Sequence, residues 1–296
     1  MRISGAESLC VSSNIFVGIE SALTIKPHLN EMTKSELCTI LTAGMGTIAS
    51  SVMALYVFIL QKDFPTIAGH LVSASVLSAP ACIVMSKLIY PETETPTTLG
   101  EDVKPHYERE GNLIEAIING ANSGTRLVVG IATLLLAFLG IVALIDLILG
   151  AFGGQLNSLF GLNIDWSLKG LLGYIFYPFT LIIGVPPSDA VQIAQVIGER
   201  TVATEVQSYQ HLAQLLAQGA IYNPRSIVIT TYALCGFAHI ASLAIFVGGI
   251  SALAPKRTRD LSRLSFRALL AATLACLMTA AIAGTFFSHS SILFGK

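Results

Sequence analysis

Charged side chains are scarce in this sequence. Asp, Glu, Lys and Arg make up 12% of its 296 residues, about half of the roughly 25% that is usual in soluble domains. A soluble fold of this size needs more ionisable surface to stay dispersed, and a chain that is 53% hydrophobic collapses rather than remaining solvated. The scarcity of charge therefore excludes a soluble globular domain and a disordered protein.

An excess of basic residues and the usual catalytic motifs are missing too. The formal net charge is −1, which gives no electrostatic footprint for nucleic acid. The five cysteines stand at wide spacings without a Cys-x-x-Cys pair, so zinc and thiol redox sites have no support and we expect buried free thiols. Without a Gly-x-Ser-x-Gly elbow or a metal triad, a membrane-embedded enzyme is disfavoured.

Long stretches without any charged residue are what the sequence has instead. Most of them reach the roughly 20 residues that a helix needs to cross the hydrocarbon core of a bilayer. They cover residues 37–61, 64–86, 127–145, 226–255 and 268–295. The sequence therefore predicts an all-α polytopic membrane protein with five membrane-spanning helices.

Two other apolar stretches, residues 4–29 and 171–214, are interrupted by glycine or proline and contain glutamates. Lipid cannot satisfy the open backbone of a broken helix, so such segments are typical of re-entrant hairpins that line a cavity. We place the breaks near Gly18 and near Gly184. The fold class that follows is five spans plus two re-entrant helical hairpins.

The orientation follows from a short basic loop predicted at residues 256–267, which contains five of the basic residues and is expected in the cytoplasm. Alternation of the spans then places the acidic loop 91–122 in the cytoplasm, the C-terminus outside, and the two hairpins on opposite faces. The end of that loop and the residues after it could form a short interfacial helix.

A faint internal repeat agrees with this orientation. The segment TAGMGTIASSVMALYVF follows the first hairpin, and TYALCGFAHIASLAIFV follows the second. Opposed hairpins, broken helices and an inverted repeat are the features of a secondary transporter. The sequence therefore predicts an inverted-repeat transport core.

Three polar residues inside these segments are candidates for binding. A carboxylate within a bilayer is costly and usually faces a cavity, and the two hydrogen bonds that it accepts suit a vicinal diol such as ribose. Glu20 and Glu205 could act in this way, or could form ion pairs. His239 could bind substrate or titrate during transport, or bond a helix carbonyl. Phe237 could stack on an aromatic ring or simply pack.

Several blocks of the sequence are similar to the concentrative nucleoside transporter family, in order and over nearly the whole chain. They include NIFVGIESALTIKPHL, LVSASVLSAPACIVMSKLIYPETE, INGANSGTRL, GVPPSDA and PRSIVITTYALCGFAHIASLAIFVGGISALAPKR. The resemblance implies a trimeric, cation-coupled nucleoside importer that works by an elevator-type motion.

The resemblance also assigns roles to residues. It implies that the substrate is bound by Ile19, Glu20, Ser21, Val52, Glu205, Phe237, His239 and Ser242. It implies a Na⁺ site at Asn14, Val17, Thr47 and Ile48, formed by side chains and backbone carbonyls. Glu205 matches the family's glutamate that holds the ribose. At the base site, the family's amide side chain is lost at the first hairpin tip, near Ile19, and the family's asparagine is replaced by His239. The ribose end is therefore retained and the base end is altered.

We thus expect a Na⁺-coupled symporter that imports nucleosides across the inner membrane as a homotrimer, with no cofactor beyond the coupling ion. Residues 1–90 would form the first hairpin region, and residues 91–296 the C-terminal transporter domain. Proton coupling, a nucleobase or other polar solute as substrate, and an inactive remnant are the alternatives. The family's early helices have no counterpart before the first hairpin, which suggests a fragment or a misplaced start.

Overall fold

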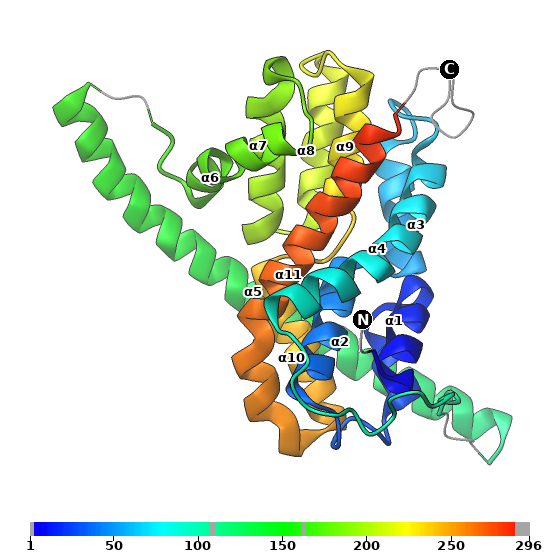
Figure 1. Cartoon of the computed structure of the whole chain (residues 1–296). Coiled ribbons are helices and arrows are strands. Elements are labelled where there is room, and N and C mark those ends of the chain that lie inside the picture. Colours follow the sequence, from blue (N-terminus) through cyan, green and yellow to red (C-terminus); the bar gives the residue numbers. More distant parts are fainter. Residues whose placement is uncertain (1–2, 107–110, 162–163, 288–296) are drawn as a thin grey trace.

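The computed structural model describes residues 3–106, 111–161 and 164–287, and this part of the chain is helical without strands, as predicted. Figure 1 shows the helices in chain order. They are α1 (Gly5–Val17), η1 (Gly18–Ile25), α2 (Lys34–Gly46), α3 (Ser50–Leu60), α4 (Ile67–Ile89), α5 (Leu113–Phe160), α6 (Leu168–Ile182), α7 (Pro187–Val202), α8 (Glu205–Ala217), α9 (Pro224–Leu234), α10 (Ile240–Leu253), η2 (Pro255–Arg257) and α11 (Thr258–Thr285).

Five stretches of the described chain are long and apolar enough to cross a membrane. They are Gly5–Ile25, Lys34–Leu60, Ile67–Ile89, Leu139–Phe160 and Pro255–Thr285. Four of them overlap predicted spans. The predicted span 226–255 is instead divided between α9 and α10, and the end of the predicted span 268–295 lies outside the described residues.

The first stretch folds back on itself at Gly18, where the sequence places a break. Gly18 has φ 66°, a left-handed value that favours glycine. Beyond it, the Ser21 hydroxyl lies 3.5 Å from the Cys10 thiol, although in a straight helix the two residues would be about 16 Å apart. α1 and η1 are therefore two arms of one hairpin.

The second broken segment contains two bends rather than one. The turn that we predicted near Gly184 joins α6 to α7, and Pro187 opens α7 at a position where its missing N–H costs nothing. The bend that carries Glu205 comes later, at Ala203, between α7 and α8. The sequence therefore located a real turn, but not the hairpin tip next to the glutamate.

Two further helices are interrupted, and their interruptions meet. α2 ends at Gly46 and α3 starts four residues later, while α9 and α10 are separated by residues 235–239. A Cβ on Gly236 (φ 157°) would lie 3.0 Å from the Gly46 carbonyl oxygen and 2.8 Å from Cys276 Sγ. The two breaks thus touch backbone to backbone, with α11 packed against them. All five cysteines are buried and free, as expected.

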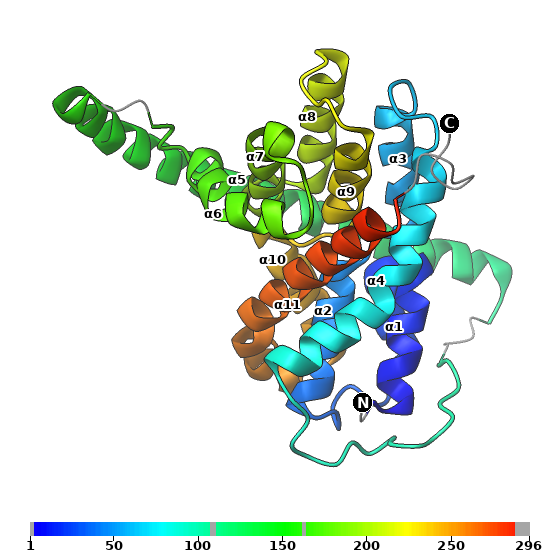
Figure 2. The same ribbon diagram turned by 45° about the horizontal axis from the view of Figure 1, so that its top comes forward.

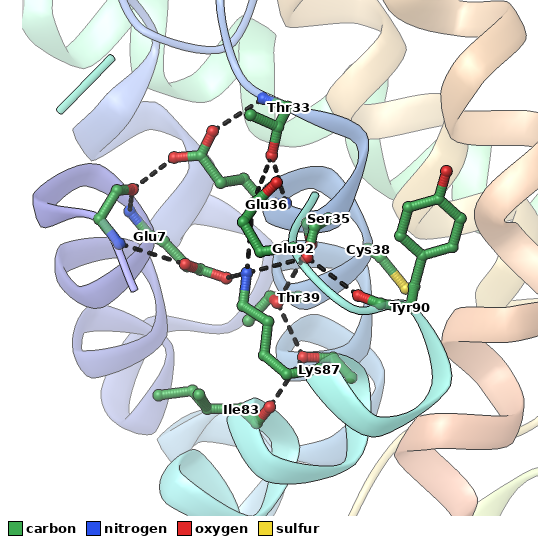
Figure 3. Close-up of polar contacts among 12 residues, drawn as sticks. Glu7, Thr33, Ser35, Glu36, Cys38, Thr39, Ile83, Lys87, Tyr90 and Glu92 are labelled. Atoms are coloured by element: carbon green, nitrogen blue, oxygen red, sulfur yellow. Dashed lines mark hydrogen bonds and ion pairs between the residues drawn. The ribbon is translucent and has the colours of Figure 1, made fainter. Parts of the chain in front are cut away.

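The base of the first hairpin is held by two linked capping boxes (Figure 3). Ser4 and Glu7 cap α1, and Thr33 and Glu36 cap α2, each pair exchanging side-chain and backbone hydrogen bonds. The Ser4 hydroxyl also donates to the Glu36 carboxylate, and Lys87 of α4 places its Nζ 2.8 Å from Glu7 Oε1. These contacts fix α1, α2 and α4 relative to one another at one end.

The long helix α5 crosses the bundle, where it contacts α10 and α6, and both of its ends project beyond the other helices (Figures 1 and 2). It has 48 residues and is therefore about 72 Å long. Its first turns contain the segment for which we considered a separate interfacial helix, so that helix does not exist on its own. Likewise, the basic segment 256–267 is not a loop, because α11 begins at Thr258.

The buried apolar side chains form two main clusters. One joins α3 and α4 to α7, α8 and α9. The other joins α1, η1 and α2 to α10 and α11. Phe237, in the break between α9 and α10, packs against both clusters, so this break lies at the seam of the core.

Candidate functional site

The two hairpin tips and the two helix interruptions surround one cavity of about 400 Å³. This volume is within the range of small-molecule sites. The first hairpin tip contributes Gly18, Ile19 and Glu20, and the start of α3 contributes Ala49, Ser51 and Val52. The remaining lining residues are Thr204, Glu205, Val206, Phe237, His239, Ser242, Ile245 and Phe246.

Glu205 is held in this cavity by residues from both halves of the chain. Tyr56 donates its hydroxyl to Oε1 at 2.8 Å, and His239 Nε2 lies 3.0 Å from Oε2. The glutamate is 4% exposed and is the first residue of α8, where the helix dipole favours a negative charge. A carboxylate oxygen accepts more than one hydrogen bond, so both oxygens retain capacity for a ligand hydroxyl.

His239 has a defined tautomer in this arrangement. It is the N-cap of α10, and its Nδ1 accepts the backbone N–H of Ser242 at 3.2 Å. Because Nδ1 is the acceptor, the ring proton of the neutral histidine is on Nε2, which faces Glu205. The contact that we considered, to a helix carbonyl, is not the one formed. His239 instead links a helix start to the buried carboxylate.

The first hairpin tip reaches the cavity because it approaches the start of α3 closely. A Cβ on Gly18 would lie 3.1 Å from Cβ of Ala49, so a side chain at this position would push the tip away. Ile19 and Glu20 line the cavity, with the Glu20 side chain exposed. Ser21 does not line it, because its hydroxyl is buried and donates to Asn14 Oδ1 at 3.3 Å.

The residues assigned to a cation lie beside this tip. Asn14 Nδ2 donates to Thr47 Oγ1 at 2.9 Å, which connects the last turn of α1 to the break after α2. Val17 is the last residue of α1, and Ile48 lies within the break. The last carbonyls of a helix lack helical partners, so backbone, amide and hydroxyl oxygens are concentrated here. Hard oxygen ligands of this kind fit Na⁺.

Sequence reasoning missed Tyr56, whose hydroxyl completes the contacts of Glu205. Tyr56 is separated from Glu205 by 149 positions, so its local sequence gives no sign that the two side chains meet. The capping boxes could have been found, since Ser4 and Thr33 are each followed three residues later by a glutamate.

The fold and the site together define a class of protein. The chain is a multi-pass helical membrane protein whose broken helices enclose a small, partly polar cavity, the architecture of a membrane transporter. The family described as "Na+ dependent nucleoside transporter C-terminus" matches residues 70–284. The chain belongs to this family of nucleoside transporters, which confirms the resemblance seen in the sequence.

Individual relatives agree with this assignment. The chain is 41% identical to "Solute carrier family 28 member 3" of Mus musculus over 96% of its own length and 41% of the relative. It is 40% identical to "Uncharacterized transporter YutK" of Bacillus subtilis, over 96% of the chain and 67% of the relative. CNTnw, solved in an inward-facing substrate-bound state, matches with TM-score 0.78 and 36% identity over 96% of this chain and 65% of that one. The chain thus spans less than half the length of the mouse relative.

Proposed function

We propose that this chain forms the transport core of a Na⁺-coupled symporter that imports nucleosides. The observation that carries the proposal is the cavity in which Glu205 is held between Tyr56 and His239. The rabbit relative "Sodium/nucleoside cotransporter 1", 34% identical over 97% of this chain, supports the choice of substrate and coupling ion.

In this proposal the sugar of the nucleoside binds at Glu205. The two hydroxyls of the ribose donate to the carboxylate, whose position is set by the hydrogen bond from Tyr56 and by the 3.0 Å contact with His239 Nε2. Ser242, at the start of α10, completes this polar end. Ile19, Val52 and Phe237 form an apolar wall for the base, so we expect the base to be recognised by shape and stacking more than by hydrogen bonds.

Na⁺ binds next to the first hairpin tip in this proposal. Asn14 and Thr47 hold it with the carbonyl oxygens of Val17 and Ile48. Ser21 supports coupling, because its hydroxyl connects Asn14 to η1, the arm that carries the tip into the cavity. A cation that orders the tip strengthens substrate binding, and by reciprocity the substrate strengthens cation binding.

The membrane arrangement is proposed from the sequence. We propose that the hairpins α1–η1 and α7–α8 are re-entrant, enter from opposite faces and belong to an inverted repeat, with residues 256–267 cytoplasmic and the C-terminus outside. We further propose insertion in the plasma (inner) membrane as a homotrimer. Residues 1–90 carry the first hairpin, and residues 91–296 form the C-terminal transporter domain.

Uptake by the purified chain in proteoliposomes tests the function. We expect an inward Na⁺ gradient to drive accumulation of radiolabelled uridine or adenosine, with competition by nucleosides and little by free bases. A protein that accumulates free bases in preference to nucleosides would be a nucleobase carrier of the same fold. Accumulation driven by a pH gradient in choline buffer would instead establish proton coupling.

A further inference from the structure

Arg200 is a fully buried cation with no acidic partner in the part of the chain that the structure describes. It lies in the last turn of α7 with 0% exposure, and its Nη1 donates to the Ala233 carbonyl near the end of α9. Nε and Nη2 have no hydrogen-bond partner among the residues that the structure describes. The neighbouring Glu199 faces elsewhere, with Lys169 at 2.9 Å and His211 at 2.6 Å. A buried charge of this kind is costly unless something compensates it.

Helix ends supply the compensation. α7 ends at Val202 and α9 ends at Leu234, one residue after the carbonyl that Arg200 binds. Each helix C-terminus carries the equivalent of roughly half a negative charge, so two of them balance about one cation. Backbone carbonyls at these two helix ends therefore balance the charge of Arg200, as a carboxylate would in an ion pair.

The first half of the chain has the same arrangement without the arginine. Asn14 lies in the last turn of α1 and contacts Thr47 at the end of α2. The Thr47 hydroxyl donates at 2.9 Å to the carbonyl of Ala43, four residues earlier in α2, whereas Arg200 reaches from α7 to the Ala233 carbonyl of α9. Neither α1 nor α2 has a basic residue in its last turn. Two helix C-termini thus meet in each half, but only the second half provides its own cation.

We propose that Arg200 is a tethered cation that occupies a second cation site, the counterpart in the second half of the proposed Na⁺ site at Asn14. The arginine fills this position permanently, so one mobile Na⁺ accompanies each substrate. This inference rests on the proposed function, because it assigns the coupling stoichiometry of the same transport core.

Replacing the arginine with a neutral oxygen donor tests the proposal. Arg200→Gln places a neutral amide near the Ala233 carbonyl, comparable to the Asn14 amide beside Thr47. We expect the Hill coefficient for Na⁺ in uridine uptake to rise from about 1 to about 2, and the charge moved per uridine to double. Arg200→Lys, which keeps the charge, should retain the wild-type values. An Arg200→Gln protein that is folded but keeps both wild-type values would overturn the proposal.

Na⁺-dependent thermal stability of the purified protein gives a second measurement that does not need transport. Na⁺ that binds only the folded protein raises Tm, so Asn14→Ala should remove the Na⁺ response of the wild type. Adding Arg200→Gln to Asn14→Ala should restore a Na⁺ response, with choline as the control ion. If Arg200→Gln has a lower Tm than the wild type, we expect Na⁺ to raise its Tm by more than it raises the wild-type Tm. A lower Tm that Na⁺ does not raise would refute the proposal.

These measurements separate failure of the inference from failure of the proposed function. A wild type without Na⁺-driven uptake contradicts the symporter itself. A wild type with normal Na⁺-driven uptake, together with an unchanged ion count in Arg200→Gln, contradicts only the tethered cation.

Discussion

Glu205→Gln is the substitution that examines the proposed ribose site most directly. The change keeps the shape of the side chain and removes its charge. The amide oxygen can still accept the Nε2 proton of His239, and the amide nitrogen can donate to Tyr56, whose hydroxyl rotates to become the acceptor. The fold around the cavity should therefore survive, while hydrogen bonds from a ligand to a carboxylate are lost.

The size of the loss follows from those hydrogen bonds. A hydrogen bond to a charged group contributes about 1.5–3 kcal/mol, against about 0.5–1.5 kcal/mol for a neutral pair. With two ribose hydroxyls on a carboxylate that is 4% exposed, the expected loss is about 1.5–3 kcal/mol. Apparent affinity for ribonucleosides should fall about 10- to 100-fold.

Uptake competition measures this change. Apparent affinities for uridine and for its 2′,3′-dideoxy analogue are compared in the wild type and in Glu205→Gln. Glu94→Gln, in an exposed loop, controls for the loss of a carboxylate elsewhere. The uridine value should weaken and the dideoxy value should change little, because the analogue lacks both hydroxyls. Unchanged affinity for uridine, or an equal loss for both compounds, would remove Glu205 from the sugar site.

Three other substitutions examine the structure around the site. His239→Asn keeps a side-chain cap at the start of α10, so Na⁺-driven uptake of uridine should persist in the proteoliposome assay. Gly236→Ala introduces a Cβ 2.8 Å from Cys276 Sγ and should cost about 1–3 kcal/mol of stability, seen as a lower Tm; Gly248→Ala, with open space around it, is the control. Asp189 lies outside the predicted spans. Burial alone would raise its pKa, but hydrogen bonds to its carboxylate hold the pKa below its ordinary value of 3.8. Stability should therefore be lost as pH falls from that value toward the lower folded-state pKa, and Asp189→Asn should lower Tm at neutral pH and flatten this dependence in acid titrations.

The spans were predictable because hydropathy depends on composition, and the failure at 226–255 has the same origin. A hydropathy average registers the apolar residues on both sides of Gly236, but not its φ of 157° or its contact with Gly46. Both depend on packing against a segment almost 200 positions away. Similarly, Gly184 and Pro187 mark a turn by their residue types, whereas the tip at Ala203 has no such local signal.

The candidate residues drew attention for a different reason. Glu205 and His239 stand out because polar groups are rare in apolar segments, and the structure places both at one cavity. What the sequence could not supply is the partner of each. Ser21 was assigned to the substrate because the resemblance aligns it with the hairpin tip that contacts the base, whereas in the structure its hydroxyl donates to Asn14.

The direction of the broken helices connects the proposed sites. α3, α8 and α10 all begin at the cavity, where their N-terminal residues Ala49, Glu205 and His239 stand. Helix N-termini favour negative groups, which suits a carboxylate at the position of Glu205. α1, α2, α7 and α9 end beside the cavity, and their C-termini favour cations. A broken helix exposes an N-terminus and a C-terminus at its centre. The same interruptions can therefore serve the sugar-bearing solute at the helix N-termini and the accompanying cation at the helix C-termini.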